Sequence, residues 1–179
     1  MTDHPMSRPV VRFASFLEAA PQIAEPMSHR FRAAGLGILA TVRPDGSPRV
    51  SPVELMFVGD GLHIGMMPGS RKYGDVRRDG RVSLLTAVAD RHDLGGEGKV
   101  FGRLRELGSD EADDVLRAGA TAAGLDADAL AGSPVFELLV EAAAWQRVEG
   151  ESWVSSTWSP VHGARRYERL GPLGERRLV

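Results

Sequence analysis

Residues 36–66 read LGILATVRPDGSPRVSPVELMFVGDGLHIGM, a pattern that indicates three consecutive antiparallel strands. The first segment, Leu36–Val42, is apolar and partly β-branched, which is typical of a strand. The segment from Pro44 to Ser47 signals a turn, because proline presets φ and glycine permits a positive φ. We therefore predict strands over Leu36–Val42, Pro48–Val58 and Leu62–Met66, joined as a meander.

The chain on both sides of this meander combines short helices with further strands. Before it, the Ser-x-x-Glu pattern that starts at Ser15 has the form of a capping box and predicts a helix there. A second helix, from about Pro26 to Ala34, is expected to end at Gly35. After the meander we expect a helix at 71–78, a strand at 81–87, a glycine-rich mobile loop at 90–98, a strand at 99–107, a helix of about 14 residues capped by 109–111, and strands at 136–148, 152–158 and 165–170.

These elements favour a mainly β fold with flanking helices. Six to eight closely spaced strands and few helices predict a closed or nearly closed antiparallel barrel rather than a doubly wound α/β sheet. A length of 179 residues suits a single domain, since lone cores split only beyond roughly 250 residues. We expect a helical arm over residues 1–35 and the barrel over residues 36–179.

Composition excludes several classes of protein. There is no cysteine, which excludes disulfides, thiolate metal sites and cysteine nucleophiles. A net charge of -2 argues against a general nucleic-acid binder. The start of the chain does not have the form of a signal peptide, and no apolar run reaches the roughly 18 residues of a membrane span, so we expect a cytoplasmic protein. The five histidines show no metal-ligand spacing, and we expect no metal site.

The most informative motif is the stretch MMPGSRKY, residues 66–73. Here a strand ends, Gly69 permits a sharp turn, Ser70 is placed to cap a helix, and Arg71 and Lys72 open that helix. Cations in a first helical turn oppose the helix dipole, and an anion bound there removes this penalty. The motif therefore indicates a phosphate site, unless these two cations are ordinary solvated surface residues.

A second motif is the strand RVSPVE, residues 49–54. Alternation places Arg49, Ser51 and Val53 on one face of this strand and Pro52 on the other. A proline inside a strand either frees backbone groups for a planar ligand or marks an edge strand, and the sequence leaves both interpretations open.

Other catalytic signatures are absent from the sequence. It contains no Walker A loop and no Gly-x-Ser-x-Gly elbow, and the glycines at 95–98 lack the strand-to-helix context of a dinucleotide fingerprint. The three tryptophans lie on late strands, where most such residues belong to a core or an interface.

Taken together, these stretches resemble the pyridoxamine 5'-phosphate oxidase-like family of FMN-binding split β-barrels. The resemblance is carried by residues 39–42 (LATV), 44–53 (PDGSPRVSPV), 69–72 (GSRK) and 77–84 (RRDGRVSL), in this order. It covers roughly residues 36–107 and is less clear beyond them.

The resemblance implies a homodimer with cofactor sites at the subunit interface and a small-molecule substrate. Arg71 and Lys72 would bind the FMN phosphate with Ser70 nearby, and Met66 would line the pocket. Backbone groups around Ser51, Pro52 and Val53 would meet the flavin ring, Arg49 is a further candidate from its strand face, and Trp158 would reach the partner's site.

The chain also departs from the vitamin oxidase itself. It lacks that enzyme's Arg-x-x-x-Leu-Lys strand and its C-terminal Arg-x-His-x-Arg motif, so we do not expect oxidation of pyridoxamine phosphate. The sequence therefore predicts a flavin-dependent oxidoreductase of unknown substrate. The alternatives are a reductase that uses the deazaflavin coenzyme F-420, and a flavin- or haem-binding module without turnover, for which the axial-ligand candidates are the histidines, Tyr73 and Tyr167.

Overall fold

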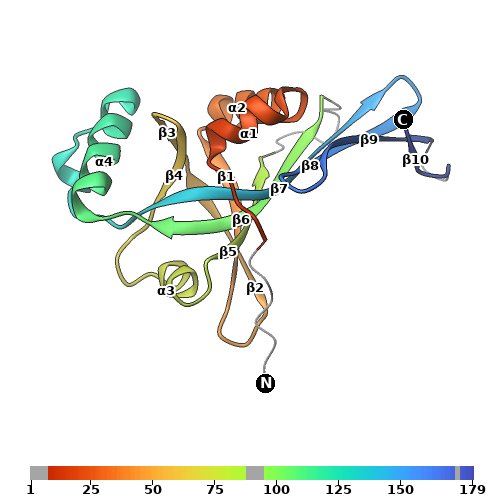
Figure 1. The fold of residues 1–179 in the computed structure, drawn as a ribbon. Coiled ribbons are helices and arrows are strands. Elements are labelled where there is room, and N and C mark those ends of the chain that lie inside the picture. Colours follow the sequence, from red (N-terminus) through yellow and green to blue (C-terminus); the bar gives the residue numbers. More distant parts are fainter. Residues whose placement is uncertain (1–7, 88–94, 172–173) are drawn as a thin grey trace.

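The computed structural model describes residues 8–87, 95–171 and 174–179, and its fold is an antiparallel β-sheet flanked by helices (Figure 1). In chain order, its elements are α1 (Phe13–Ala19), α2 (Pro21–Ala34), β1 (Leu36–Val42), β2 (Pro48–Glu54), β3 (Met56–Val58), β4 (Gly61–Gly65), α3 (Arg71–Arg78), β5 (Arg81–Thr86), β6 (Glu97–Glu106), α4 (Ser109–Ala123), the 3-10 turn η1 (Asp128–Leu130), β7 (Val135–Glu149), β8 (Ser152–Ser159), β9 (Gly163–Leu170) and β10 (Arg177–Leu178).

The pairing of the strands produces a split barrel. Among the described residues the hydrogen-bonded path runs β10-β9-β8-β7-β6-β5-β1-β2, and β4 pairs with both β3 and β7. The long strand β7 is the branch point, because it pairs with β4 near Val135 and with β8 near Glu149. Cα atoms of β2 and β4 come within 8 Å of each other, but no ladder joins these two strands in the described residues. The predicted fold class is confirmed.

The predicted meander is instead two hairpins, β1–β2 and β3–β4, with no ladder between them in the described residues. The segment predicted as one strand over Pro48–Val58 is two strands, because the chain changes partners at Leu55: β2 pairs with β1, and β3 pairs with β4. This break and the short C-terminal strand β10 give ten strands in the described residues, where six to eight were predicted.

Helices α1 and α2 lie together over one end of the barrel (Figure 1). Their buried side chains belong to the same core cluster as those of the strands, and Phe16, Ile23 and Phe31 are completely buried. Helices and strands that are far apart in the sequence therefore share one apolar interior, whose burial is the main stabilising contribution for a domain of this size.

The starts of these two helices differ from the prediction. Helix α1 begins at Phe13, so Ser15 lies inside it and caps nothing. Helix α2 begins at Pro21 rather than near Pro26, because a proline at the first helical position costs no hydrogen bond. The predicted end is confirmed, since Gly35 has a positive φ of 63°.

The remaining predictions concern α4 and the loop before β6. Helix α4 has acidic residues in its first turn as predicted, but its N-cap is Gly108, and no side chain caps it. It packs against β3 over a second, smaller apolar cluster that includes Val115 and Leu116. Of the loop predicted at 90–98, residues 90–94 lie outside the described residues, and strand β6 already begins at Glu97.

Candidate functional site

The turn between β4 and α3 forms the first part of the candidate site. Gly69 has a φ of +74°, a conformation that side chains rarely adopt, and Ser70 follows as the N-cap of α3. The Ser70 hydroxyl oxygen accepts a hydrogen bond from the backbone N–H of Tyr73 at 3.4 Å. The predicted cap and the predicted helix are thus both confirmed, and the cap fixes where the first helical turn points.

Two cations stand at this helix start without a partner. Arg71 is exposed and Lys72 is half-buried, and neither side chain forms an ion pair or hydrogen bond within the part of the chain that the structure describes. The cations at the other end of α3 are paired: Arg77 contacts Glu106 at 3.2 Å, and Arg78 contacts Asp75 at 3.6 Å. The uncompensated positive charge of α3 is therefore concentrated at its N-terminus, where the helix dipole makes it least favourable.

A buried carboxylate connects α3 to the neighbouring strands. Asp75 is 3% exposed and accepts hydrogen bonds from the Thr41 hydroxyl at 3.0 Å and from Arg49 Nε at 2.7 Å. Burial alone would raise the pKa of Asp75, but the hydrogen bonds from Arg49 and Thr41 and the charges of Arg49 and Arg78 hold that pKa below its ordinary value. Asp75 is therefore a charged anchor between α3, β1 and β2.

This anchor orients Arg49 and leaves part of it available. Its Nε is bound to Asp75, its side chain is 19% exposed, and its terminal nitrogens have no partner among the described residues. A guanidinium held through Nε presents its remaining N–H donors in a fixed plane, which suits an oxyanion. Arg49 thus lies next to α3.

Strand β2 shows the predicted alternation. Arg49 and Ser51 are half-buried and Val53 is buried, whereas Pro52 lies on the exposed face. Within the described residues β2 pairs only with β1 and forms an edge of the sheet, with Pro52 opposite Ile38. The structure thus places Pro52 on an edge strand, which was one of its two predicted interpretations.

An apolar cavity of about 280 Å³ lies beside the turn that leads into α3. Its lining is dominated by methionine and leucine side chains, and its charged member is Glu54 at the end of β2. The lining residues are Glu54, Met56, Gly65, Met66, Met67, Pro68, Leu116, Leu130 and Ser133. Met66 is the one sequence-predicted site residue in this set, and Met66–Pro68 lead directly to the Ser70 cap. An apolar space thus lies next to a cationic helix start, which fits a ligand with a flat ring and an anionic group.

Trp158 lies elsewhere. It is 5% exposed, and its ring packs against that of Phe16 at a centroid distance of 5.0 Å. The side chain belongs to the core of its own chain and has no exposed face to present to a partner. The exposed tryptophan of the same strand is Trp153, at 51%.

A second polar cluster, which was not predicted from the sequence, surrounds Glu137 on β7. Glu137 is 1% exposed; its carboxylate accepts hydrogen bonds from Arg12 Nε at 2.6 Å and from Arg105 at 2.6 Å. Burial alone would raise the pKa of Glu137, but the hydrogen bonds and charges of both arginines hold it below its ordinary value. The signal that sequence reasoning missed is an acid in an otherwise apolar run, FELLV.

His63 lies opposite Glu137 in the ladder between β4 and β7. Burial lowers the pKa of His63, although the Glu137 charge acts in the opposite direction, and its Nδ1 has no hydrogen-bond partner among the described atoms. The imidazole lies directly over Gly61, where an added Cβ would come within 2.3 Å of the ring. None of the residues of this cluster lines the apolar cavity, and the Glu137 carboxylate is paired with Arg12 and Arg105.

Within the described residues, no group of three or more histidine or acidic side chains is placed to hold a metal ion. No described helix combines the length and the apolar character needed to cross a membrane.

The geometry can be compared with known proteins. A family model described as pyridoxamine 5'-phosphate oxidase matches residues 23–147, a span that includes β2, the Ser70 cap and α3. No curated protein sequence is significantly similar to this one.

Solved structures share the fold at low sequence identity. A heme-binding protein from Mycobacterium smegmatis is 20% identical, with a TM-score of 0.59 over 75% of this chain and 57% of that one. The heme storage protein HutZ from Vibrio cholerae is 18% identical, with a TM-score of 0.56 over 69% of this chain and 90% of that one. A Clostridium acetobutylicum protein of the pyridoxinephosphate oxidase family, related to general stress protein 26, is 10% identical, with a TM-score of 0.57 over 83% and 96%. This chain therefore spans little more than half the length of the Mycobacterium protein.

Proposed function

We propose that this chain, which belongs to the pyridoxamine 5'-phosphate oxidase family, is an FMN-binding, flavin-dependent oxidoreductase that acts on a small molecule. The observation that carries the proposal is the pair Arg71 and Lys72, unpartnered among the described residues at a serine-capped helix start. Such a helix start binds a phosphate through backbone N–H groups, a hydroxyl and charge-assisted hydrogen bonds.

The described residues fit FMN at both of its ends. Arg71 and Lys72 would hold the phosphate. The Ser70 hydroxyl, which already accepts a hydrogen bond, still has its own proton to donate. The apolar cavity lined by Met66 offers a dry surface for the ring, near the strand that carries Ser51 and Val53. When bound, FMN supplies hydride transfer at its ring, so the protein needs to bind, orient and exclude water rather than provide a nucleophile.

The proposal includes a homodimer in which a second copy completes the site. In support, β2 has an unpaired edge among the described residues, and two apolar side chains near the site are strongly exposed, Val50 at 63% and Met67 at 75%. A second copy over this edge would cover both side chains and shield the flavin ring from water.

A haem-binding role without turnover is the second candidate, because the Mycobacterium and Vibrio structures are described as heme-binding and heme-storage proteins. Such a role needs an axial ligand. Of the histidines in the described part of the chain, His29 and His162 are exposed and His63 is buried. Tyr73 donates its hydroxyl to Glu106 at 3.2 Å, and the ring of Tyr167 is covered by Arg176. None of these five side chains lies at the start of α3 except Tyr73, whereas the unpartnered cations Arg71 and Lys72 do, and they favour a phosphate-bearing cofactor.

The first test is the visible absorption spectrum of the freshly purified protein. The expected result is absorption at about 370 and 450 nm from a cofactor that heat releases as FMN. A single band near 420 nm would assign the deazaflavin or, if sharp and intense, haem. A colourless protein that binds neither FMN nor the deazaflavin on addition contradicts the proposal.

The second test addresses the phosphate site. Arg71→Ala combined with Lys72→Ala should weaken FMN binding by about 3 kcal/mol, or roughly a hundredfold in Kd, because two charge-assisted hydrogen bonds are lost. Titration calorimetry of the FMN-free protein measures this change. Arg77→Ala is the matched control on the same helix, since Arg77 is paired with Glu106, and it should leave the Kd unchanged. Equal Kd values for the double variant and the control would remove the phosphate assignment.

A further inference from the structure

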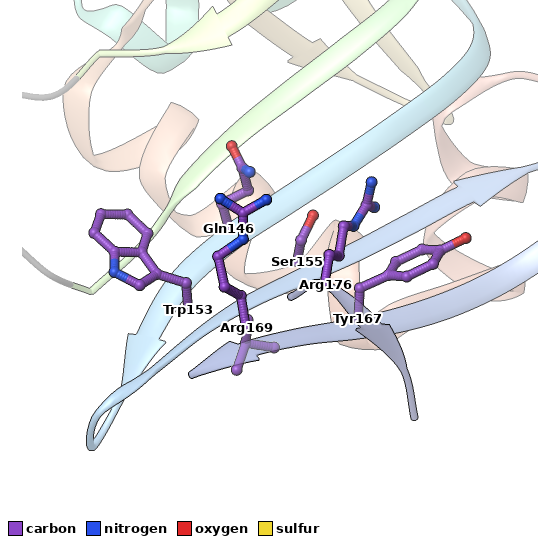
Figure 2. A pocket seen from close by; sticks show the side chains of 7 residues that line it. Gln146, Trp153, Ser155, Tyr167, Arg169 and Arg176 are labelled. Carbon is purple, nitrogen blue, oxygen red and sulfur yellow. The ribbon is translucent and has the colours of Figure 1, made fainter. Parts of the chain in front are cut away.

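A second cavity, of about 430 Å³, opens on the strands near the C-terminus of the chain (Figure 2). Its lining comes from β7, β8, β9 and the segment just before β10, and all of it except Gln146 lies beyond the span that matches the family model. The lining residues are Gln146, Trp153, Val154, Ser155, Tyr167, Arg169 and Arg176. The cavity is therefore formed by the part of the chain that the candidate flavin site does not use.

Strand register explains why these side chains meet. Ser155 of β8 is the partner of Gln146 on β7 and of Tyr167 on β9, so these three side chains form one row across the sheet. Trp153 and Arg169 are partners in a neighbouring row, two residues along the same strands and hence on the same face. Figure 2 shows the labelled side chains gathered on one side of these strands.

The positive charge of this cavity is not neutralised by the described residues. Arg169 forms no ion pair within them, and Arg176 lies over the ring of Tyr167, 3.8 Å from its centroid. The neighbouring Arg166, on the opposite face of β9, instead contacts Glu149 and Glu168, each at 2.8 Å. Two guanidinium groups, one of them held by an aromatic ring, thus face the cavity without an acid.

The other lining groups suit a flat ligand. Trp153 is 51% exposed and offers an aromatic surface beside Arg169. The side-chain oxygen Oε1 of Gln146 accepts a hydrogen bond from Lys99 Nζ at 2.9 Å, which leaves the side-chain NH2 group of Gln146 without a partner in the described residues. The Ser155 hydroxyl adds a further donor to the same row.

We propose that this cavity binds a planar aromatic oxyanion, with its charged group at Arg169 and Arg176 and its ring against Trp153. This inference does not depend on the flavin proposal, because it uses none of the residues around α3. The ligand class follows from the lining: the arginines require a carboxylate- or phosphate-like group, and the indole favours a conjugated ring.

The test follows the Trp153 indole N–H signal by NMR while 2-naphthoate is added. The chain has three tryptophans, and Trp153→Phe identifies the signal. The titration uses the FMN-free protein, because FMN is itself an aromatic oxyanion and would compete for this cavity. The Trp153 signal reports on this cavity, since the proposed flavin site uses residues around α3. We expect a saturable shift of the Trp153 signal. The neutral analogue 2-naphthamide and the non-aromatic anion cyclohexanecarboxylate should each bind at least tenfold more weakly.

Two charge-matched double variants complete the test. Arg169→Gln with Arg176→Gln should weaken naphthoate binding at least tenfold, because both oxyanion contacts are lost. Arg165→Gln with Arg177→Gln removes the same charge from exposed residues outside this cavity and should leave the Kd unchanged. The proposal is overturned if the Trp153 signal shows no saturable shift, if 2-naphthamide binds as tightly as 2-naphthoate, or if the two double variants bind equally.

Discussion

Two arginine-containing regions of this molecule differ in whether their positive charges are paired with acids. At the start of α3, Arg71 and Lys72 have no acidic partner among the described residues. Around β7, Arg12 and Arg105 both contact the buried carboxylate of Glu137. Both regions contain cationic side chains, but those around β7 are paired with an acid of the same chain, whereas those at the start of α3 have none among the described residues.

The difference indicates what each region does. A carboxylate that is almost completely buried must be paired, since an unpaired charge in the interior costs several kcal/mol. The Glu137 cluster therefore stabilises the fold. Cations at an exposed helix start need no partner for stability and oppose the helix dipole, and the proposed phosphate site would give them a function there. Three predictions test this contrast, in order of decreasing effect.

Glu137→Gln should cause the largest loss, about 3 kcal/mol in the free energy of unfolding. The change keeps the size of the side chain but removes the charge that pairs with Arg12 and Arg105, and breaking a buried ion pair costs about that much. Urea denaturation followed by circular dichroism measures the loss.

Glu111→Gln is the matched control. Its carboxylate contacts the same Arg105 at 3.2 Å but is 48% exposed, so the expected change is below about 0.5 kcal/mol. If both variants lose the same amount, the cluster is no more stabilising than an ordinary surface pair, and the contrast fails.

Acid should weaken the fold through the buried carboxylates. The folded-state pKa values of Glu137 and Asp75 lie below their ordinary values of 4.5 and 3.8, so the unfolded chain takes up protons first as the pH falls. The stabilisation is complete above about pH 5 and is lost as the pH falls through the folded-state pKa values, with a slope of at most about 1.4 kcal/mol per pH unit for each group.

Urea titrations between pH 7 and pH 3 check this dependence. The free energy of unfolding should decline gently once the pH falls below about 6.5, because the unfolded chain protonates His63 before the folded chain does. Below about pH 5 it should decline more steeply, and this steep part should be shallower in Glu137→Gln, which lacks one of the two buried carboxylates. A free energy that stays constant or rises toward pH 3 contradicts the assignment of these carboxylates as charged anchors.

Arg71→Gln combined with Lys72→Gln should have the smallest effect on stability. Without bound cofactor, we expect the free energy of unfolding to be unchanged or to rise by at most about 1 kcal/mol, because both cations oppose the helix dipole and have no partner among the described residues. Arg77→Gln, at the favourable end of the same helix, should lower it by a few tenths of a kcal/mol. A clear loss of stability in the double variant would show that these cations serve the fold.

Much of the fold could be predicted from the sequence because its signals are local. The turn at 44–47, the end of α2 at Gly35 and the start of α3 after Ser70 each depend on backbone preferences of a few neighbouring residues. The same holds for the alternation along β2, which follows from the strand period alone. Predictions failed where two local signals compete, as at Ser15 and Pro21, or where a strand changes partner, as at Leu55.

The candidate site was predictable only in part. The motif at 69–72 was visible because a cap, a glycine and two cations occur together. Asp75 was not singled out, because an acid inside a basic helix looks like a surface residue until Thr41 and Arg49 are seen to face it. Trp158 was expected at the partner's site by analogy with a late tryptophan of the family, whereas its ring packs against Phe16 in the core of its own chain.

The sequence by itself determined most of the strands and helices, which face of β2 carries Arg49, and where a helix starts with two cations. The tertiary structure alone decided which charges are neutralised. Arg49 and Asp75 are 26 positions apart, and Arg12 and Glu137 are 125 apart. Local preferences fix dihedral angles and faces, whereas the partner of a charged side chain depends on how distant elements pack. For that reason the contrast between the paired arginines at Glu137 and the unpaired cations of α3 appears only in the folded molecule.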